Sequence, residues 1–165
     1  MLKSEIIQKK ILTPEQLERH LAFWRFKNKK IVFTNGCFDF IHLGHIDYLM
    51  KAADYGDIML IGLNSDESVR RLKGKDRPVN NEHARAMLLA SLSFVTGVIV
   101  FSEDTPYELI RTVKPDVLVK GNDYKIEEIA GHDIVLEKGG QVITVDLLPG
   151  YSTTAFIEKL KKIEG

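Results

Sequence analysis

The residue types and spacing that point most directly to chemistry are the two histidines of the segment Asp39-Phe-Ile-His42-Leu-Gly44-His45. His42 and His45 are three residues apart, so at the start of a helix their imidazoles face the same side. Gly44 lets the backbone approach a bound group closely, and the first amides of a helix offer donors and a partial positive charge to an anion. The pattern predicts a phosphate site, where imidazole N–H groups stabilise the charge that builds on a phosphoryl group under attack.

Other interpretations of the histidines have less support. An H-x-x-H pattern recurs by chance, and a zinc site usually needs a third protein ligand, whereas His20, His83 and His132 are scattered along the chain. Two common phosphate motifs are absent: Gly74-Lys75 is followed by Asp76 rather than Ser or Thr, and no G-x-G-x-x-G follows a predicted strand. A P-loop kinase and a dinucleotide-binding dehydrogenase therefore lose support.

The histidines follow an apolar strand predicted at Ile31–Thr34 and open a helix predicted at Leu43–Tyr55. The same alternation continues along the chain. Further strands are predicted at Ile58–Leu63, Val98–Phe101, Asp116–Lys120 and Gln141–Asp146, and further helices at Ser65–Leu72, Asn81–Phe94, Thr105–Val113 and Ser152–Ile163. Short, nearly all-apolar strands between helices predict a five-stranded parallel sheet covered on both faces, a doubly wound, Rossmann-like α/β fold.

In a doubly wound sheet, ligands bind beyond the carboxyl ends of the strands. Four of the predicted strands are followed by polar residues that suit a phosphate site. They are Asn35, Asp39, His42 and His45 after the first strand, Asn64, Ser65 and Asp66 after the second, Lys120–Asp123 after the fourth and Ser152–Thr154 after the fifth. We therefore predict that these residues meet at one edge of the sheet.

Several basic residues are candidates for binding a phosphate. Lys73, Lys75 and Arg77 flank a glycine in a charged stretch, where they either close over a phosphate or form a solvated loop. Lys120 is more specific, because it ends an apolar strand at the ligand edge of the predicted sheet. Arg85, on the helix predicted from residue 81, either faces the site or forms a surface ion pair.

The composition excludes a global attraction to polyanions. Lys plus Arg (23) equal Asp plus Glu (23), and 44% of the residues are hydrophobic, so neither nucleic acid nor a membrane is an expected partner. Cys37 is the only cysteine, which cannot form an internal disulfide, and we expect it to be a small buried side chain. No apolar run approaches a membrane span, and the N-terminus lacks a signal-peptide core, so we expect a cytoplasmic protein.

Residues 1–28 are predicted to form a helical extension, and residues 29–165 the main domain. Thr13-Pro14-Glu15-Gln16 combines an N-cap, a proline at the first helical position and a capping box. Leu17, Leu21 and Trp24 follow on one helical face, so we expect this helix to pack on the domain.

The segment Asn35-Gly-Cys-Phe-Asp-Phe-Ile-His-Leu-Gly-His45 resembles the G-x-F-D-x-x-H-x-G-H signature of the cytidylyltransferase-like nucleotidyltransferases of the HIGH superfamily. These enzymes transfer nucleotides to small phosphates. Gly150-Tyr-Ser-Thr-Thr154 is similar to their second signature, a Ser/Thr-rich turn that opens the last helix, and the resemblance covers about residues 29–163. In glycerol-3-phosphate cytidylyltransferases this turn reads R-T-x-G-I-S-T-T, whereas Leu147–Thr154 lacks the arginine.

Three segments, Val69–Val79, Lys114–Tyr124 and Leu148–Thr154, instead resemble the heptose-1-phosphate adenylyltransferases. Those enzymes occur alone or as half of a bifunctional kinase/adenylyltransferase, and a chain of 165 residues resembles the stand-alone form. The resemblance implies Mg²⁺-dependent transfer of AMP from ATP to D-glycero-β-D-manno-heptose 1-phosphate, which gives ADP-heptose for lipopolysaccharide or surface glycans, and a homodimer or higher homo-oligomer. The alternatives are a cytidylyltransferase acting on glycerol 3-phosphate or another small alcohol phosphate, and a catalytically silent nucleotide-binding domain.

The resemblance also implies roles for individual residues. His42, His45 and Lys120 would be catalytic. The nucleotide would be bound by Thr34, Asn35, Gly36, Cys37, Phe38, Asp39, Gly44, Lys73, Lys75, Gly121, Asp123, Ser152, Thr153 and Thr154, and the acceptor by Asn64, Asp66, Arg77, Arg85 and Tyr124. No residue is implied as a direct metal ligand, except that Asp39 either helps to place magnesium, orients a histidine or forms a turn.

Overall fold

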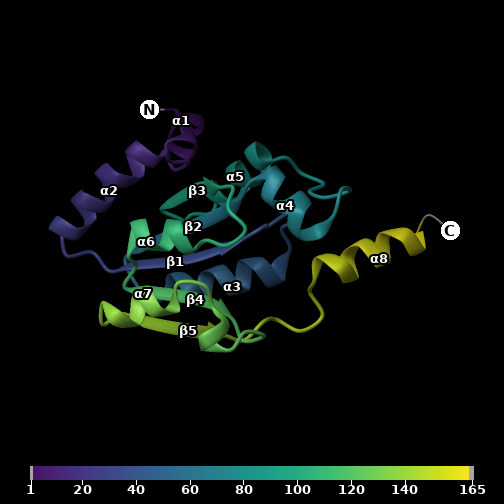
Figure 1. Ribbon diagram of the computed structural model, residues 1–165. Helices are drawn as coiled ribbons and strands as arrows, with labels where there is room; N and C mark the ends of the chain where they lie inside the picture. The colour runs from purple at the N-terminus through teal and green to yellow at the C-terminus, as the bar shows by residue number, and fades with distance from the viewer. Residues whose placement is uncertain (1, 164–165) are drawn as a thin grey trace.

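The computed structural model describes residues 2–163 and contains one sheet of five parallel strands with helices on both faces (Figure 1). The strand order is β3-β2-β1-β4-β5. The strands are β1 (Ile31–Gly36), β2 (Ile58–Asn64), β3 (Gly97–Phe101), β4 (Val117–Gly121) and β5 (Gln141–Val145). The predicted doubly wound α/β fold is confirmed, with strand ends shifted by one or two residues.

Six of the helices match predicted ones. These are α2 (Pro14–Phe26), α3 (Leu43–Ala53), α4 (Asp66–Lys73), α5 (Glu82–Ala90), α6 (Tyr107–Val113) and α8 (Thr153–Ile163). Two short helices, α1 (Lys3–Gln8) and α7 (His132–Glu137), and a 3₁₀ turn, η1 (Ile126–Glu128), have no predicted counterpart. Helix α5 ends four residues earlier than predicted, because the chain must turn there to bring Thr96 N–H to the Met59 carbonyl of β2.

Alternate residues of the strands face two separate cores, as the period of two in a strand requires. Val32 and Val119 face a cluster formed with α3 and α5. Phe33 and Leu118 face a second cluster, formed with α2, α6 and α7. Helices cover both faces, which explains why the strands read as nearly continuous apolar runs. Among residues 2–163, no helix is long and apolar enough to cross a membrane.

Helix α2 is packed on the sheet as expected. Its capping box is formed: Gln16 N–H donates to Thr13 Oγ1 at 3.3 Å, and Thr13 N–H donates to Gln16 Oε1 at 2.9 Å. Leu17, Leu21 and Trp24 are buried in the second cluster. The predicted extension therefore shares a core with the main domain.

The chain before α2 also covers an edge of the sheet. Ile11 forms an isolated parallel bridge with Val98 of β3. Leu12 N–H donates to the Val98 carbonyl, and Val98 N–H donates to the Lys10 carbonyl, both at 2.8 Å. Residues 10–12 thus pair with the outer side of β3.

Candidate active site

The candidate site lies where β1 and β4 separate. These strands pair only at Val32–Val117 and Phe33–Leu118, whereas β1 pairs with β2 over its whole length. The strand order also reverses here, since β2 and β3 lie on one side of β1 and β4 and β5 on the other. Ligands of doubly wound sheets bind at such a switch point.

A buried chain of hydrogen bonds joins the two strands as they separate. The Tyr48 hydroxyl of α3 donates to the Val119 carbonyl at 3.0 Å, and the Thr34 hydroxyl lies 2.6 Å from the Tyr48 oxygen. Since the phenol has one proton, Thr34 is the donor to Tyr48. Burial raises the pKa of Tyr48. The enclosed Thr34 side chain thus fixes α3 to the sheet. Only the main chain of Thr34 is left to contact a nucleotide.

The loop after β1 folds back to support a histidine. Phe38 has a φ of 44°, in the left-handed region that residues other than glycine rarely adopt. Its ring covers Gly36, where a Cβ would lie 2.9 Å from Phe38 Cε2. The same buried ring meets His45 edge-on, with ring centroids 5.4 Å apart. Gly36 therefore makes room for the ring that supports His45.

His42 and His45, the histidine pair, stack at the amino end of α3. Their ring centroids are 3.9 Å apart with an interplanar angle of 21°, and His42 is the N-cap residue. Within residues 2–163, neither Nδ1 atom has a hydrogen-bond partner, although both are buried. Burial lowers the pKa of His42, and burial together with the neighbouring His42 lowers the pKa of His45 to about 4. Both rings are therefore neutral at pH 7, and each has one N–H to donate.

The segment Gly150–Thr154 lies against the same helix end. A Cβ on Gly44 would lie 2.9 Å from Tyr151 Cβ and 3.0 Å from His42 Nδ1. A side chain at position 44 would thus have to displace either the histidine ring or the C-terminal segment. Glycine at this position allows the two expected signatures to meet.

Helix α8 contacts the loop between β1 and α3 through an aromatic pair. The rings of Phe156 and Phe40 have centroids 5.2 Å apart, and beyond this contact α8 extends away from the sheet (Figure 1). The first turn of α8 is closed by Phe156 N–H, which donates to the Ser152 carbonyl at 3.0 Å. Ser152, Thr153 and Thr154 thus lie between Tyr151, which packs on Gly44 of α3, and Phe156, which packs on Phe40.

Lys120 reaches across the crevice from β4. Its Nζ donates to the Asn35 carbonyl at 3.4 Å and lies 5.4 Å from the centre of the Tyr124 ring. Burial lowers the pKa of Lys120 to about 8, although the charge of Asp123 acts in the opposite direction. A Cβ on Gly121 would lie 2.6 Å from Asp123 Oδ1, so glycine lets this carboxylate fold back toward β4. The ammonium is mostly protonated at pH 7, which suits a contact with phosphate.

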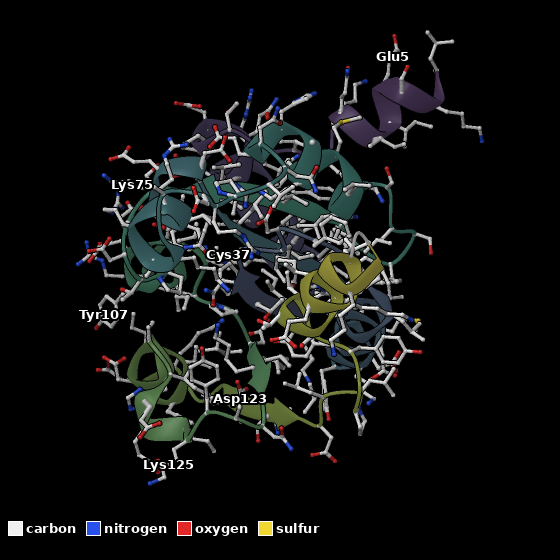
Figure 2. All side chains as sticks on the ribbon, turned by 90° about the vertical axis from the view of Figure 1, so that its right-hand side faces the viewer. Glu5, Cys37, Lys75, Tyr107, Asp123 and Lys125 are labelled. Carbon is white, nitrogen blue, oxygen red and sulfur yellow. The ribbon has the colours of Figure 1, made fainter. Side chains whose placement is uncertain are left out.

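Two exposed lysines stand at the end of α4: Lys73 is its last residue, and Lys75 is on the loop that follows. Figure 2 shows Cys37 between Lys75 on one side and Asp123 on the other. The positive charge of Lys73 acts on both Cys37 and His45. Burial raises the pKa of the Cys37 thiol, so it is protonated at pH 7 and a poor nucleophile.

Asp39 is occupied by protein donors. Its side chain is only 1% exposed; Arg77 Nε donates to it at 2.6 Å, and the Val79 and Asn80 N–H groups donate at 2.8 and 3.0 Å. Burial alone would raise the pKa of this carboxyl, but the hydrogen bonds outweigh burial and hold the pKa below its ordinary value. Asp39 and Arg77 thus clamp residues 77–80 onto the histidine loop.

Arg85 also fixes the loop after β1 in place. Its fully buried guanidinium donates to the carbonyls of Cys37, Asn64 and Asn80 at 2.6, 2.8 and 2.9 Å, and to the Asp66 carboxylate at 2.7 Å. One side chain therefore ties the loop after β1 to the end of β2 and the start of α5. The resemblance implies Asn64, Asp66 and Arg85 at the acceptor, but Arg85 donates to the Asn64 carbonyl and the Asp66 carboxylate.

Within residues 2–163, no three His, Cys, Asp or Glu side chains lie close enough together to hold a metal ion. Both oxygens of Asp39 already accept protein hydrogen bonds. Mg²⁺ usually keeps several waters and binds through one or two carboxylates plus substrate phosphates. The residues present therefore fit an ion that arrives with a nucleotide rather than one held in a protein cage.

Several supporting residues lack a signal in the sequence. Tyr48 and Tyr151 read as ordinary aromatic residues of a helix and a turn, although one joins β1 to β4 and the other covers Gly44. Asn80 directly precedes the helix predicted from Asn81, and its side chain donates to the Asp39 carbonyl at 2.8 Å, whereas Asn81 caps α5.

Comparison with known proteins places this geometry in a family. Residues 33–159 match the family model described as cytidylyltransferase-like. The bifunctional protein HldE of Rhodopseudomonas palustris (strain BisB5) is 51% identical over 156 residues, which are 94% of this chain and 32% of that protein. HldE of Campylobacter jejuni subsp. jejuni is 53% identical over 154 residues, 93% of this chain and 32% of that protein. The chain thus spans about a third of the length of these curated relatives.

A solved structure is also similar to this chain in both sequence and fold. The crystal structure of the lipopolysaccharide core biosynthesis protein from Thermoplasma volcanium GSS1 is 31% identical, with a TM-score of 0.59 over 73% of this chain and 97% of that chain. The segment that matches the family model runs from β1 into α8 and contains the histidine pair, Lys120 and Ser152–Thr154. The chain therefore belongs to the cytidylyltransferase-like family of nucleotidyltransferases.

Proposed function

We propose that this protein transfers AMP from ATP to D-glycero-β-D-manno-heptose 1-phosphate and releases ADP-heptose and pyrophosphate. The observation that carries the proposal is the stacked, neutral histidine pair at the amino end of α3, with Lys120 at the adjoining crevice. The acceptor is suggested by the similarity to HldE proteins and to a lipopolysaccharide core biosynthesis protein. A cytoplasmic setting, where ATP is available, is part of the proposal.

In the proposed step, an oxygen of the acceptor phosphate attacks the α-phosphorus of ATP. A new P–O bond forms, the bond to the β-phosphate oxygen breaks, and pyrophosphate leaves. The nucleophile is already an anion, so the step needs neither a protein base nor a covalent intermediate. His42 and His45 would donate their N–H groups to the α-phosphoryl oxygens, where charge builds in the transition state. Mg²⁺ bound with the triphosphate would neutralise further charge.

Other residues would hold the substrates. The hydroxyls and amides of Ser152–Thr154 would bind the β- and γ-phosphates at the start of α8. Lys73 at the end of α4 and Lys75 on the loop after it would approach the same phosphates. The main chain of residues 35–38 would line the nucleotide. Tyr124, exposed beyond β4, would contact the acceptor, and so would the neighbouring Asp123, which the resemblance implies at the nucleotide.

We further propose that the buried polar residues act by position. Asp39 and Arg77 would hold the histidine loop in place, and Arg85, with Asn64 and Asp66, would hold the ends of β1 and β2. A homodimer, implied by the family, is also part of the proposal, and light scattering tests it.

The test is pyrophosphate release with ATP and CTP, each crossed against heptose 1-phosphate, glycerol 3-phosphate and phosphoethanolamine. We expect turnover with ATP and heptose 1-phosphate. Activity with CTP alone would instead assign a cytidylyltransferase, and no turnover with any pair would leave a nucleotide-binding domain.

The variant His42→Ala tests the role of the histidine pair. We expect kcat to fall by roughly 10²–10³-fold, as when one donor to a developing oxyanion is removed, with ATP affinity largely retained. A kcat near that of the wild type would contradict the role of His42.

A further inference from the structure

Asn35 lies on the face of the sheet opposite to the histidine pair. Side chains alternate along a strand, and Phe33, two residues before Asn35, belongs to the cluster under α2, α6 and α7. Gly62 of β2 gives independent evidence for this position: a Cβ there would lie 2.8 Å from Phe33 Cζ, 3.3 Å from Asn35 Cβ and 3.2 Å from Leu109 Cδ2 of α6. The Asn35 side chain therefore leaves β1 on the α6 side of the crevice.

The side-chain amide of Asn35 is enclosed but lacks a partner. Its Oδ1 is buried and has no hydrogen-bond partner within residues 2–163. The main-chain carbonyl of the same residue accepts from Lys120 Nζ, so the residue is fixed in place while its amide oxygen is unused. Most buried polar side-chain atoms in native proteins have a partner, because leaving one without a partner costs stability. An unused acceptor at the ligand edge indicates that a ligand supplies the donor.

The groups on the β4 side of the crevice favour a hydroxyl as that donor. Lys120 is also a donor, and its Nζ lies 5.4 Å from the centre of the half-exposed Tyr124 ring. The Asp123 carboxylate lies close enough to Lys120 to oppose the effect of burial on its pKa. A carboxylate repels a second phosphate but accepts hydrogen bonds from hydroxyl groups, and an aromatic ring offers an apolar face. Together with the amide oxygen of Asn35, these groups suit a sugar.

We infer that Asn35 Oδ1 accepts a hydrogen bond from a hydroxyl of the acceptor sugar and so determines which sugar phosphate is used. The inference rests on the proposed function, in that the acceptor is a sugar phosphate. The acceptor spans the crevice: its phosphate meets the nucleotide near Lys120, and its ring lies on the α6 side with Asn35. A sugar that lacks the matching hydroxyl leaves Oδ1 without a partner and is therefore a poorer substrate.

The variant Asn35→Leu removes the amide and keeps the approximate size of the side chain. With heptose 1-phosphate and its monodeoxy analogues, we expect the wild type to lose about tenfold in kcat/KM on one analogue, the magnitude of one hydrogen bond. On the parent sugar, Asn35→Leu should lose about as much in kcat/KM relative to wild type. Replacing the parent sugar with that analogue should cost the variant nothing further, and its KM for ATP should stay within about twofold of wild type. The two losses are not additive because they remove one shared contact.

A stability measurement separates this role from a structural one. Because Oδ1 has no protein partner, Asn35→Leu should not lower the urea midpoint of the free protein. The matched control is Thr34→Val at the preceding residue, which faces α3 and loses its hydrogen bond to Tyr48, so its midpoint should fall. If Asn35→Leu and the smaller change Asn35→Ala both lower the midpoint as much as Thr34→Val does, the amide serves the fold and the inference is overturned.

Two kinetic results would also overturn it. One is an Asn35→Leu enzyme that discriminates among the analogues as the wild type does. The other is a raised KM for ATP with sugar discrimination intact, which would assign the amide to the nucleotide. A wild type that transfers to no sugar phosphate refutes the proposed function and this inference together, whereas an active wild type with an unaltered variant refutes this inference alone.

Discussion

The clamp formed by Asp39 makes a strong prediction about stability. Asp39→Asn keeps the shape of the side chain but removes its charge and replaces one acceptor oxygen with a donor that faces N–H groups. Three donors, Arg77 Nε and the N–H groups of Val79 and Asn80, lose all or part of their partner. Removing one partner of a buried ion pair costs about 3–5 kcal/mol. We therefore expect a loss of that size, out of the roughly 5–15 kcal/mol that stabilise a domain.

Urea unfolding followed by circular dichroism at pH 7 measures this loss. The control is Asp57→Asn, because Asp57 also accepts a main-chain hydrogen bond, from Lys30 N–H at 2.8 Å, but is exposed; its midpoint should stay near that of the wild type. Equal midpoints for the two variants would refute the reasoning.

The pH dependence of stability is a second readout of the clamp. The pKa of Asp39 is lower in the folded protein than in the unfolded chain, where it is about 3.9. Its contribution is therefore fully present above pH 4 and is lost as pH falls through the folded pKa. Asp39→Asn should lack this loss on acidification.

Two further predictions concern titrating groups at the site. The pKa of His45 is about 4 in the folded protein and about 6.5 when unfolded, so the unfolded chain binds more protons between these values. The urea midpoint should therefore fall as pH falls from about 6.5 to 4, and His45→Gln should flatten this slope; an unchanged slope would contradict the assignment. For Lys120, a pKa of about 8 predicts that kcat/KM declines above pH 8 as the ammonium is lost. Lys120→Arg, which stays protonated, should retain activity at higher pH. Lys120→Met should lose roughly 10²-fold in kcat/KM at pH 7. The same decline of kcat/KM above pH 8 in Lys120→Arg and in the wild type would exclude the lysine as the titrating group.

The order of elements is predictable because the signals that set it are local. Thr13, Ser65 and Asn81 stand at predicted helix starts, and in each case the side chain accepts from the main-chain N–H three residues later. The apolar runs that become β1 and β2 are also read directly from neighbouring residues. Helices α1 and α7 have six residues each, too few to show a helical period.

The position of the site is equally predictable, but the roles of its polar residues are not. Asp39 and Arg85 lie at the carboxyl edge of the sheet, yet most of their partners are 19 to 48 residues away in sequence. A polar residue after a strand looks the same whether a ligand or a distant main-chain group takes its hydrogen bonds. The fold shows that Asp39 and Arg85 bind protein groups, whereas the side-chain oxygen of Asn35 has no hydrogen-bond partner among the described residues.

The pairing of residues 10–12 with β3 affects how the molecule behaves in a crowded solution. An uncovered edge strand is a template on which another chain can add a strand and begin to aggregate. On this side of the sheet the first residues of the chain occupy that template, whereas β5, the last strand on the other side, carries exposed polar residues at Gln141 and Thr144. A tag or truncation that displaces residues 10–12 would therefore leave the candidate active site untouched and yet make the protein prone to self-association.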